Sequence, residues 1–95
     1  MLPSHKEVAV LDLLAREAKL YGLEMVEASE GALKRGTIYV TLSRMQKKGY
    51  VESWLDDASP SNAPARRRYR ITALGRRMLR AWRMVHSSLN AEPAT

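Results

Sequence analysis

The stretch that decides the fold is Gly36–Ser53, which reads GTIYVTLSRMQKKGYVES. Its first part has the apolar spacing of a helix that starts at Thr37 and ends before Gly49, a residue type that suits the left-handed turn after a helix. Three apolar side chains share one face of this helix: Ile38, Leu42 and Met45. After Gly49 the spacing changes to alternation, so the stretch predicts a helix followed directly by a strand.

The opposite face of this predicted helix carries cations around an outward valine. Val40 falls beside Arg44 and Lys47, and no acidic residue occurs between positions 31 and 51. A single exposed valine is common on soluble proteins and needs no explanation. A face built to meet a polyanion would explain both features, because cations bind phosphate and a valine can pack on a thymine methyl group.

Upstream, the sequence predicts two further helices. Ser4 and Glu7 form a capping box at the start of the first helix. Residues 20–22 are interpreted as a short break in the chain. A two-turn helix is then expected over Leu23–Ser29, with two of its apolar side chains in the core: Leu23 and Val26.

Downstream, two stretches alternate apolar and polar side chains, as strands do. These are Tyr50–Asp56 and Arg67–Ile71, in which Tyr69 is expected to face the core. Between them, Asp57–Ala65 is small, polar and marked by prolines, so we expect a mobile hairpin loop. Thr72 is placed to cap a last helix. The order predicts a mainly α fold with a small β-hairpin wing, a winged helix-turn-helix with one added helix.

The last helix has an apolar stripe that is too long for so small a domain to cover alone. Its members recur every three or four residues: Leu74, Met78, Trp82, Val85 and Leu89. The simplest way to bury the stripe is to pack it against the same stripe of a second copy, so these five residues are expected to form a dimer interface. We therefore divide the chain into a winged helix-turn-helix domain (1–71), a dimerisation helix (72–90) and a frayed tail (91–95).

The positive charge is unevenly distributed along the 95 residues, whose net charge is +6. Residues 1–30 have a net charge of −3, residues 31–51 carry five cations and no acid, and residues 66–83 carry eight arginines and no acid. Such segregation is the electrostatic pattern of nucleic-acid binding, although a solvated basic surface that binds nothing specific has the same composition.

The inventory of reactive side chains argues against an enzyme or a metal site. Zero cysteines exclude disulfides and thiolate ligands. His5 and His86 have no partner at the spacing of a metal site or a catalytic triad. No cofactor is therefore expected. No apolar run reaches the roughly 18 residues of a membrane span, and no signal peptide is recognised, so a cytoplasmic location is expected.

Five stretches taken together resemble the PadR family of bacterial transcriptional regulators, and the resemblance extends from about Val8 to Leu79. One residue departs from the family pattern, because Val40 stands where the family usually has a proline. The stretches are Leu20–Glu24 (LYGLE), Gly36–Tyr39 (GTIY), Leu42–Met45 (LSRM), Gly49–Ser53 (GYVES) and Arg67–Gly75 (RRYRITALG).

This resemblance implies a dimeric repressor of the short subfamily that binds double-stranded DNA, at an operator expected to be an inverted repeat. Its third helix would enter the major groove, and its wing would touch the backbone or the minor groove. Some short members bind flat apolar compounds between the subunits beside a tryptophan. Trp82 and Met78 would then line a site for a small apolar effector, although ordinary interface core is the favoured interpretation of Trp82.

The residues expected to contact DNA are of three kinds. The third helix offers its outward side chains to base edges, with Arg44 suited to guanine. The chain before and after that helix, with its N-terminal N–H groups, is expected to bind phosphate, as is the wing. In chain order the set is Lys34, Arg35, Gly36, Thr37, Val40, Thr41, Ser43, Arg44, Lys47, Lys48, Arg66, Arg67 and Arg68.

Two tyrosines have alternative interpretations from the sequence. Tyr39 can either pack sideways or reach a phosphate with its hydroxyl group, and Tyr21 can either meet a phosphate or pack against the third helix. Two other functions also stay open for the whole chain. A winged-helix module that binds protein is the main alternative, and RNA binding is the third, although few aromatic side chains are left to stack on bases.

Overall fold

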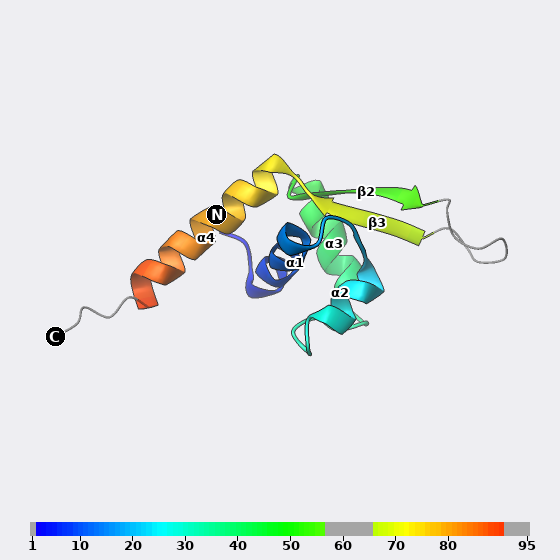
Figure 1. Cartoon of the computed structure of the whole chain (residues 1–95), viewed down its shortest axis with the longest axis horizontal. Helices are drawn as coiled ribbons and strands as arrows, with labels where there is room; N and C mark the ends of the chain where they lie inside the picture. The colour runs from blue at the N-terminus through cyan, green and yellow to red at the C-terminus, as the bar shows by residue number, and fades with distance from the viewer. Residues whose placement is uncertain (1, 57–65, 91–95) are drawn as a thin grey trace.

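The computed structural model describes residues 2–56 and 66–90, which form four helices and a small sheet (Figure 1). The helices are α1 (His5–Arg16), α2 (Gly22–Ala28), α3 (Ile38–Lys47) and α4 (Ala73–Asn90), and the strands are β1 (Leu20–Tyr21), β2 (Val51–Asp56) and β3 (Arg66–Ile71). This confirms the winged helix-turn-helix with an added C-terminal helix. The expected loop at 57–65 and tail at 91–95 lie outside the described residues, as does the side chain of Leu89.

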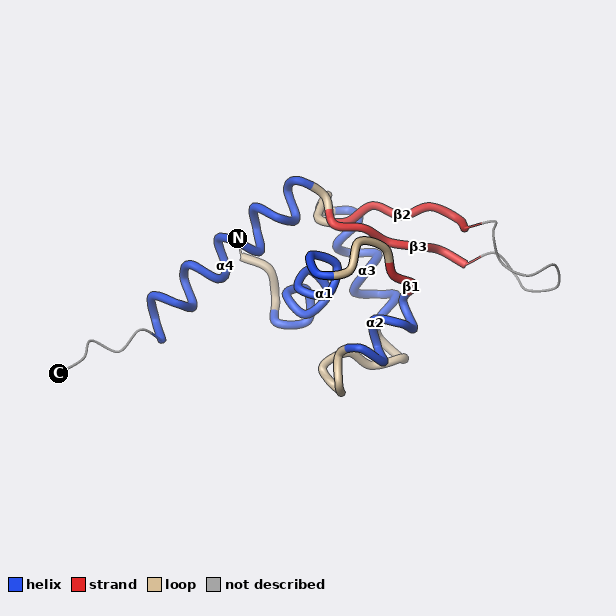
Figure 2. Tube along the Cα trace, viewed as in Figure 1, coloured by secondary structure: helices blue, strands red, loops and turns tan. Residues whose placement is uncertain are grey.

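The wing is the antiparallel hairpin of β2 and β3, paired from Val51 opposite Ile71 to Asp56 opposite Arg66. A strand that the sequence did not predict, β1, pairs with the other edge of β3, so the sheet order is β1-β3-β2 (Figure 2). Residues 20–22, interpreted as a break, therefore begin as a strand. Two residues are too few to show a periodicity. Such a short strand is defined by its pairing with β3.

Local hydrogen bonds fix the ends of the helices as predicted. Ser4 and Glu7 form the capping box of α1, with the Ser4 N–H donating to Glu7 Oε1 at 2.9 Å and the Glu7 N–H to Ser4 Oγ at 3.2 Å. After α3, Gly49 has a φ of 80°, and the Tyr50 N–H donates to the Met45 carbonyl at 2.9 Å, which is the pattern of a Schellman turn. The helix and the following strand are therefore joined by a tight turn at residues 48–50.

The start of α4 is held against the end of α3. Thr72 Oγ1 accepts the Gly75 N–H at 3.0 Å, as an N-cap does, and donates to the Gly49 carbonyl at 2.5 Å. Gly75 is buried, and a Cβ built there would lie 2.2 Å from the Tyr50 carbonyl oxygen. Only glycine permits this close approach, so the wing, α3 and α4 meet at one fixed junction.

The core lies between α1, α2, α3 and the sheet. Its fully buried side chains come from every one of these layers: Val10, Leu11, Leu14, Met25, Ile38, Leu42, Met45 and Val51. Tyr69 is buried, as expected. The prediction that Leu23 is buried is wrong, since Leu23 is 41% exposed while Met25 fills the core and Val26 is half-buried. A helix as short as α2 has too few apolar residues for their spacing to fix its inner face.

Helix α4 extends away from the rest of the molecule (Figure 1). Near its start it packs on the core through Leu79, which is 3% exposed, and further along Arg83 hydrogen-bonds to Asp12 on α1. Two apolar side chains beyond this contact are open to solvent, Met84 at 67% and Val85 at 40%. The chain therefore covers only part of the helix.

Candidate nucleic-acid interface

The phase of α3 is as the sequence predicts. Ile38, Leu42 and Met45 are at most 1% exposed, whereas Val40 is 52% exposed on the other side of the helix. The outer surface of α3 and its N-cap consists of exposed side chains: Thr37, Tyr39, Val40, Ser43, Arg44, Gln46 and Lys47. The structure therefore exposes every α3 residue that was predicted to contact DNA except one.

The exception is Thr41, and the prediction that it contacts DNA is wrong. Its side chain is 8% exposed, because position 41 lies beside Ile38 and Met45 on the inner edge of the helix. Thr41 borders a small hollow shared with Glu7 and Lys48, at the contact between α3 and the start of α1. A residue that packs on α1 has no surface left to offer to DNA.

The segment before α3 is exposed from Lys34 to Thr37. The backbone N–H groups of Thr37 and Ile38 both donate to the Lys34 carbonyl, at 3.2 and 3.0 Å. The helix N-terminus that was expected to offer free N–H groups to a phosphate is therefore partly used within the chain. The side chains of Lys34 and Arg35 remain exposed beside it.

Lys48 is tied to α1 by an ion pair. Its Nζ lies 2.8 Å from Glu7 Oε2, and Glu7 is buried. Burial alone would raise the pKa of Glu7, but the hydrogen bonds from Lys48 and Ser4 together outweigh it and hold the pKa below 4.5. The cation expected at a phosphate thus has an acidic partner in this structure, and it fastens the end of α3 to α1.

In the structure Tyr21 contacts the wing, which neither of its two expected roles included. The guanidinium groups of Arg66 and Arg68 lie 4.7 and 4.2 Å from the centre of its ring, and its hydroxyl donates to Asp56 Oδ2 at 2.6 Å. That hydrogen bond raises the pKa of Tyr21 above 10.0. Arg68 Nε also donates to Asp56 Oδ2, at 2.5 Å. Asp56 thereby joins the far end of the wing hairpin to the start of α2, a link between residues far apart in sequence that no local pattern reveals.

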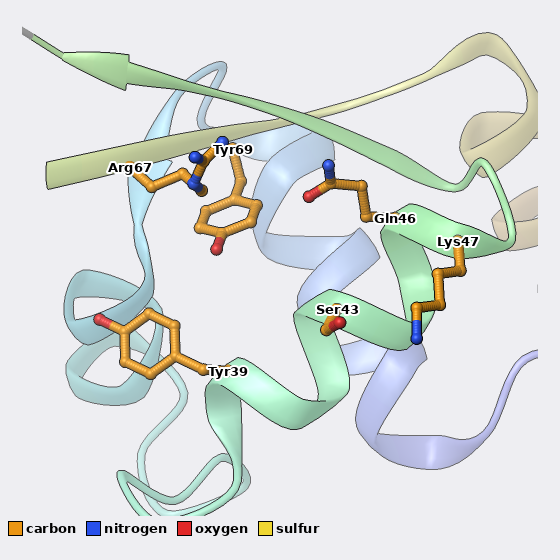
Figure 3. Close-up of a pocket in the computed structure, with 6 residues that line it drawn as sticks. All are labelled: Tyr39, Ser43, Gln46, Lys47, Arg67 and Tyr69. Atoms are coloured by element: carbon orange, nitrogen blue, oxygen red, sulfur yellow. The ribbon is translucent and has the colours of Figure 1, made fainter.

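A groove of about 430 Å³ separates α3 from the wing (Figure 3). It is lined by Tyr39, Ser43, Gln46, Lys47, Arg67 and Tyr69. On the wing side, Arg67 Nη1 donates to Ser53 Oγ at 3.0 Å, and Ser53 Oγ donates to Gln46 Oε1 at 2.9 Å. Sequence reasoning missed Gln46 and Ser53, because neutral polar side chains give no charge signal.

Tyr39 packs sideways, which is one of its two expected roles. Its ring packs on the backbone of Gly22, where an added Cβ would lie 2.8 Å from the ring. The side chain is nevertheless half exposed and borders the groove (Figure 3). The α2–α3 contact therefore fixes the ring while part of the side chain faces solvent.

The stripe on α4 is only partly covered by the chain itself. Leu74, Met78 and Trp82 are partly buried against the core, and Val85 is exposed. Trp82 stacks on His86 with ring centroids 3.8 Å apart, and His5 meets both rings edge-on. Among residues 2–56 and 66–90, no group of three or more histidine or acidic side chains could hold a metal ion. No helix in these ranges is long and apolar enough to cross a membrane.

Comparison with solved structures supports the fold assignment. A PadR family transcription regulator from Clostridium difficile matches with a TM-score of 0.72 and 24% identity, over 92% of this chain and 96% of that one. A PadR family regulator from Eggerthella lenta matches with a TM-score of 0.73 and 29% identity, over 87% and 72%. Bacillus subtilis PadR in complex with operator DNA matches with a TM-score of 0.71 and 19% identity, over 94% and 49%.

Sequence comparison identifies the family. No curated protein sequence matches the chain. A family model described as the transcriptional regulator PadR-like family matches residues 10–81, which is most of the chain and includes α2, α3 and the wing. The chain belongs to the PadR-like family of transcriptional regulators.

Proposed function

We propose that the chain forms a homodimer that binds an inverted-repeat operator in double-stranded DNA and represses transcription there. The observation that carries the proposal is the outer face of α3, where Val40 is 52% exposed among cations and no acid occurs from position 31 to 51. The operator-bound structure of Bacillus subtilis PadR, which shares this fold, supports the same partner.

In this proposal α3 lies in the major groove and reads base edges. Arg44 is exposed and can donate two parallel hydrogen bonds to guanine O6 and N7. Val40, which is 52% exposed, can pack on a thymine methyl group. Replacing that thymine by uracil would then weaken binding of the wild-type protein and leave binding of Val40→Ser unchanged.

The wing and the segment before α3 are proposed to hold the DNA backbone. Lys34, Arg35 and Arg67 are exposed cations on the two sides of α3. Phosphate contacts of this kind position a protein on the duplex and provide affinity without reading sequence. Arg68 is proposed to have a smaller part, because its guanidinium already binds Asp56.

The dimer is proposed to form through α4, where the stripe is only partly covered. Two copies related by a two-fold axis would present two α3 helices to successive major grooves, which requires half-sites about 34–36 Å apart. A small apolar effector between the subunits would contact Trp82 and Met78, and it would act by changing this separation. Bound to a promoter, such a dimer blocks access to it, which is the basis of the proposed repression.

Selection of bound duplexes from a pool of random sequence tests the proposal. The expected result is enrichment of an inverted repeat whose half-sites are about one helical turn apart. Recovery of no preferred sequence, together with association constants that are equal for all duplexes, would contradict it. Capture of a protein partner without any duplex binding would favour the interaction module instead.

A further inference from the structure

A short relay of hydrogen bonds connects the wing to α3. Arg67 Nη1 donates to Ser53 Oγ at 3.0 Å, and Ser53 Oγ lies 2.9 Å from Gln46 Oε1. An arginine side chain has no acceptor, so at this end the direction of donation is fixed. Ser53 in turn donates its hydroxyl proton to Gln46 Oε1, so the relay runs from the wing toward the helix.

This direction determines what Gln46 can offer to a ligand. Its amide oxygen accepts from Ser53, which leaves the two protons of the amide nitrogen as donors. Gln46 lines the groove between α3 and the wing (Figure 3). Without Ser53, the amide could turn its oxygen into the groove instead.

The other residues that line the groove are also donors. Lys47 and Arg67 can only donate, and Tyr39, Ser43 and Tyr69 can each donate a hydroxyl proton. Burial, partly offset by the nearby Arg67, raises the pKa of Tyr69, so its phenol keeps the proton. None of the six described lining residues is acidic. The groove is therefore a concave surface of donors with two positive charges.

The nature of these donors distinguishes between two parts of DNA. A base pair presents donors and acceptors side by side in the major groove, whereas a phosphodiester presents only acceptors and a negative charge. We propose that the groove holds a phosphodiester of one DNA strand, with Gln46 as a direct donor to it and Ser53 as the residue that positions the Gln46 amide. The proposal rests on the proposed DNA-binding function and gives this groove, and with it Lys47, a backbone role rather than a base-reading one.

The test is a set of fluorescence-anisotropy titrations of the full chain at several KCl concentrations. Two duplexes are used, one selected from a random pool and one with the same composition in shuffled order. The variants are Gln46→Ala, Gln46→Glu, Ser53→Ala and the double variant Ser53→Ala/Gln46→Ala, with Arg67→Ala as the charged comparison. Ser87→Ala, on the exposed surface of α4, is the matched control. Thermal melting checks that each variant is folded.

Gln46→Ala is expected to weaken binding about tenfold on both duplexes, as loss of a hydrogen bond to a charged group does. The salt dependence should keep its wild-type slope, because an amide carries no charge, whereas Arg67→Ala should lower the log–log slope by about 0.9. Gln46→Glu should bind more weakly than Gln46→Ala, because a carboxylate repels phosphate. Ser53→Ala should weaken binding in the wild-type background and have no further effect once Gln46 is alanine.

Three results would overturn the proposal. If Gln46→Ala weakens only the selected duplex and relaxes the preference at one base pair, Gln46 reads a base. If Gln46→Glu binds as well as Gln46→Ala, no phosphate lies near it. If Ser53→Ala has the same effect whether or not Gln46 is present, Ser53 does not act through the amide. Failure of the wild-type protein to bind either duplex would be recognised separately, because it removes the proposed function together with this inference.

Discussion

The two helices that carry the proposed contacts, α3 and α4, differ in how completely the chain covers their apolar faces. In α3 the inner face is fully covered, with Leu42 and Met45 at 0% exposure. In α4 the chain buries Leu79 but leaves Met84 and Val85 at 67% and 40% exposure. One helix has completed its packing within the monomer, and the other has not.

The difference indicates what kind of partner each helix can bind. What remains outside on α3 is polar and cationic apart from Val40, and such a surface suits a hydrated polyanion. On α4 the exposed side chains include four arginines, but Met84 and Val85 are exposed as well and Trp82 is only half-buried. Such an apolar surface suits another protein chain. The proposed roles of the two helices therefore follow from the same measurement, the exposure of their side chains.

The largest expected effect comes from truncating the inner face of α3. Leu42→Ala removes a fully buried side chain and should cost about 2–5 kcal/mol of unfolding free energy. The matched change on the outer face, Val40→Ser, should cost no more than about 0.5 kcal/mol. Denaturant unfolding at a fixed protein concentration measures both. A loss of several kcal/mol in Val40→Ser would mean that the helix phase is wrong.

The second prediction concerns the stripe on α4. Trp82→Ala together with Met78→Ala should convert the proposed dimer to a monomer or unfold it, because much of the apolar area is expected to be shared between two copies. Arg76→Ala, an exposed change on the same helix, should leave the assembly intact. Sedimentation velocity distinguishes these states. A stable wild-type monomer would contradict the proposal that α4 binds a second copy of the chain.

The third prediction separates two neighbouring wing arginines by their partners. Arg67→Ala should lower the log–log slope of DNA affinity against salt by about 0.9, as loss of one phosphate contact does. Arg68→Ala should lower it by less, since Arg68 is 30% exposed and its Nε lies 2.5 Å from Asp56. Titrations at several salt concentrations measure the slopes. Equal reductions would show that the Asp56 pair does not restrain Arg68.

The smallest expected effect is at the ion pair that fastens α3 to α1. Because the folded-state pKa of Glu7 is held below its ordinary value of 4.5, the ionised group stabilises the folded protein. That contribution is complete well above pH 4.5 and is lost as the pH falls through the lower, folded-state value. Glu7→Gln should therefore be less stable than wild type at neutral pH, with the difference shrinking as the pH falls below 4.5. A difference independent of pH would contradict this.

Local signals in the sequence were sufficient for much of the fold. The phase of α3, the Ser4–Glu7 capping box, the turn at Gly49 and the cap at Thr72 each depend on residues within a few positions of one another. Such features can be predicted because helix periodicity and capping are properties of short segments. The outward position of Val40, on which the proposed site depends, came from the same periodicity.

The remaining features depend on contacts between distant segments, and the sequence does not show them. Strand β1 exists because it pairs with β3, and Thr41 is buried because α1 packs over the inner edge of α3. The bond from Tyr21 to Asp56 joins residues 35 positions apart. Gln46 is linked to the wing by Ser53, which lies on a different element. Spacing within a segment carries no information about these neighbours.

The central claim is that the outer face of α3 reads DNA sequence, and Arg44 tests it most directly. The measurement is the affinity of wild type and Arg44→Ala for the selected duplex and for its shuffled counterpart at one salt concentration. Wild type should prefer the selected duplex by about 10³-fold or more. Arg44→Ala should lose roughly 1–3 kcal/mol on the selected duplex and relax the preference at one base pair, with a smaller loss on the shuffled one. Equal losses on both duplexes, or none on either, would contradict the claim.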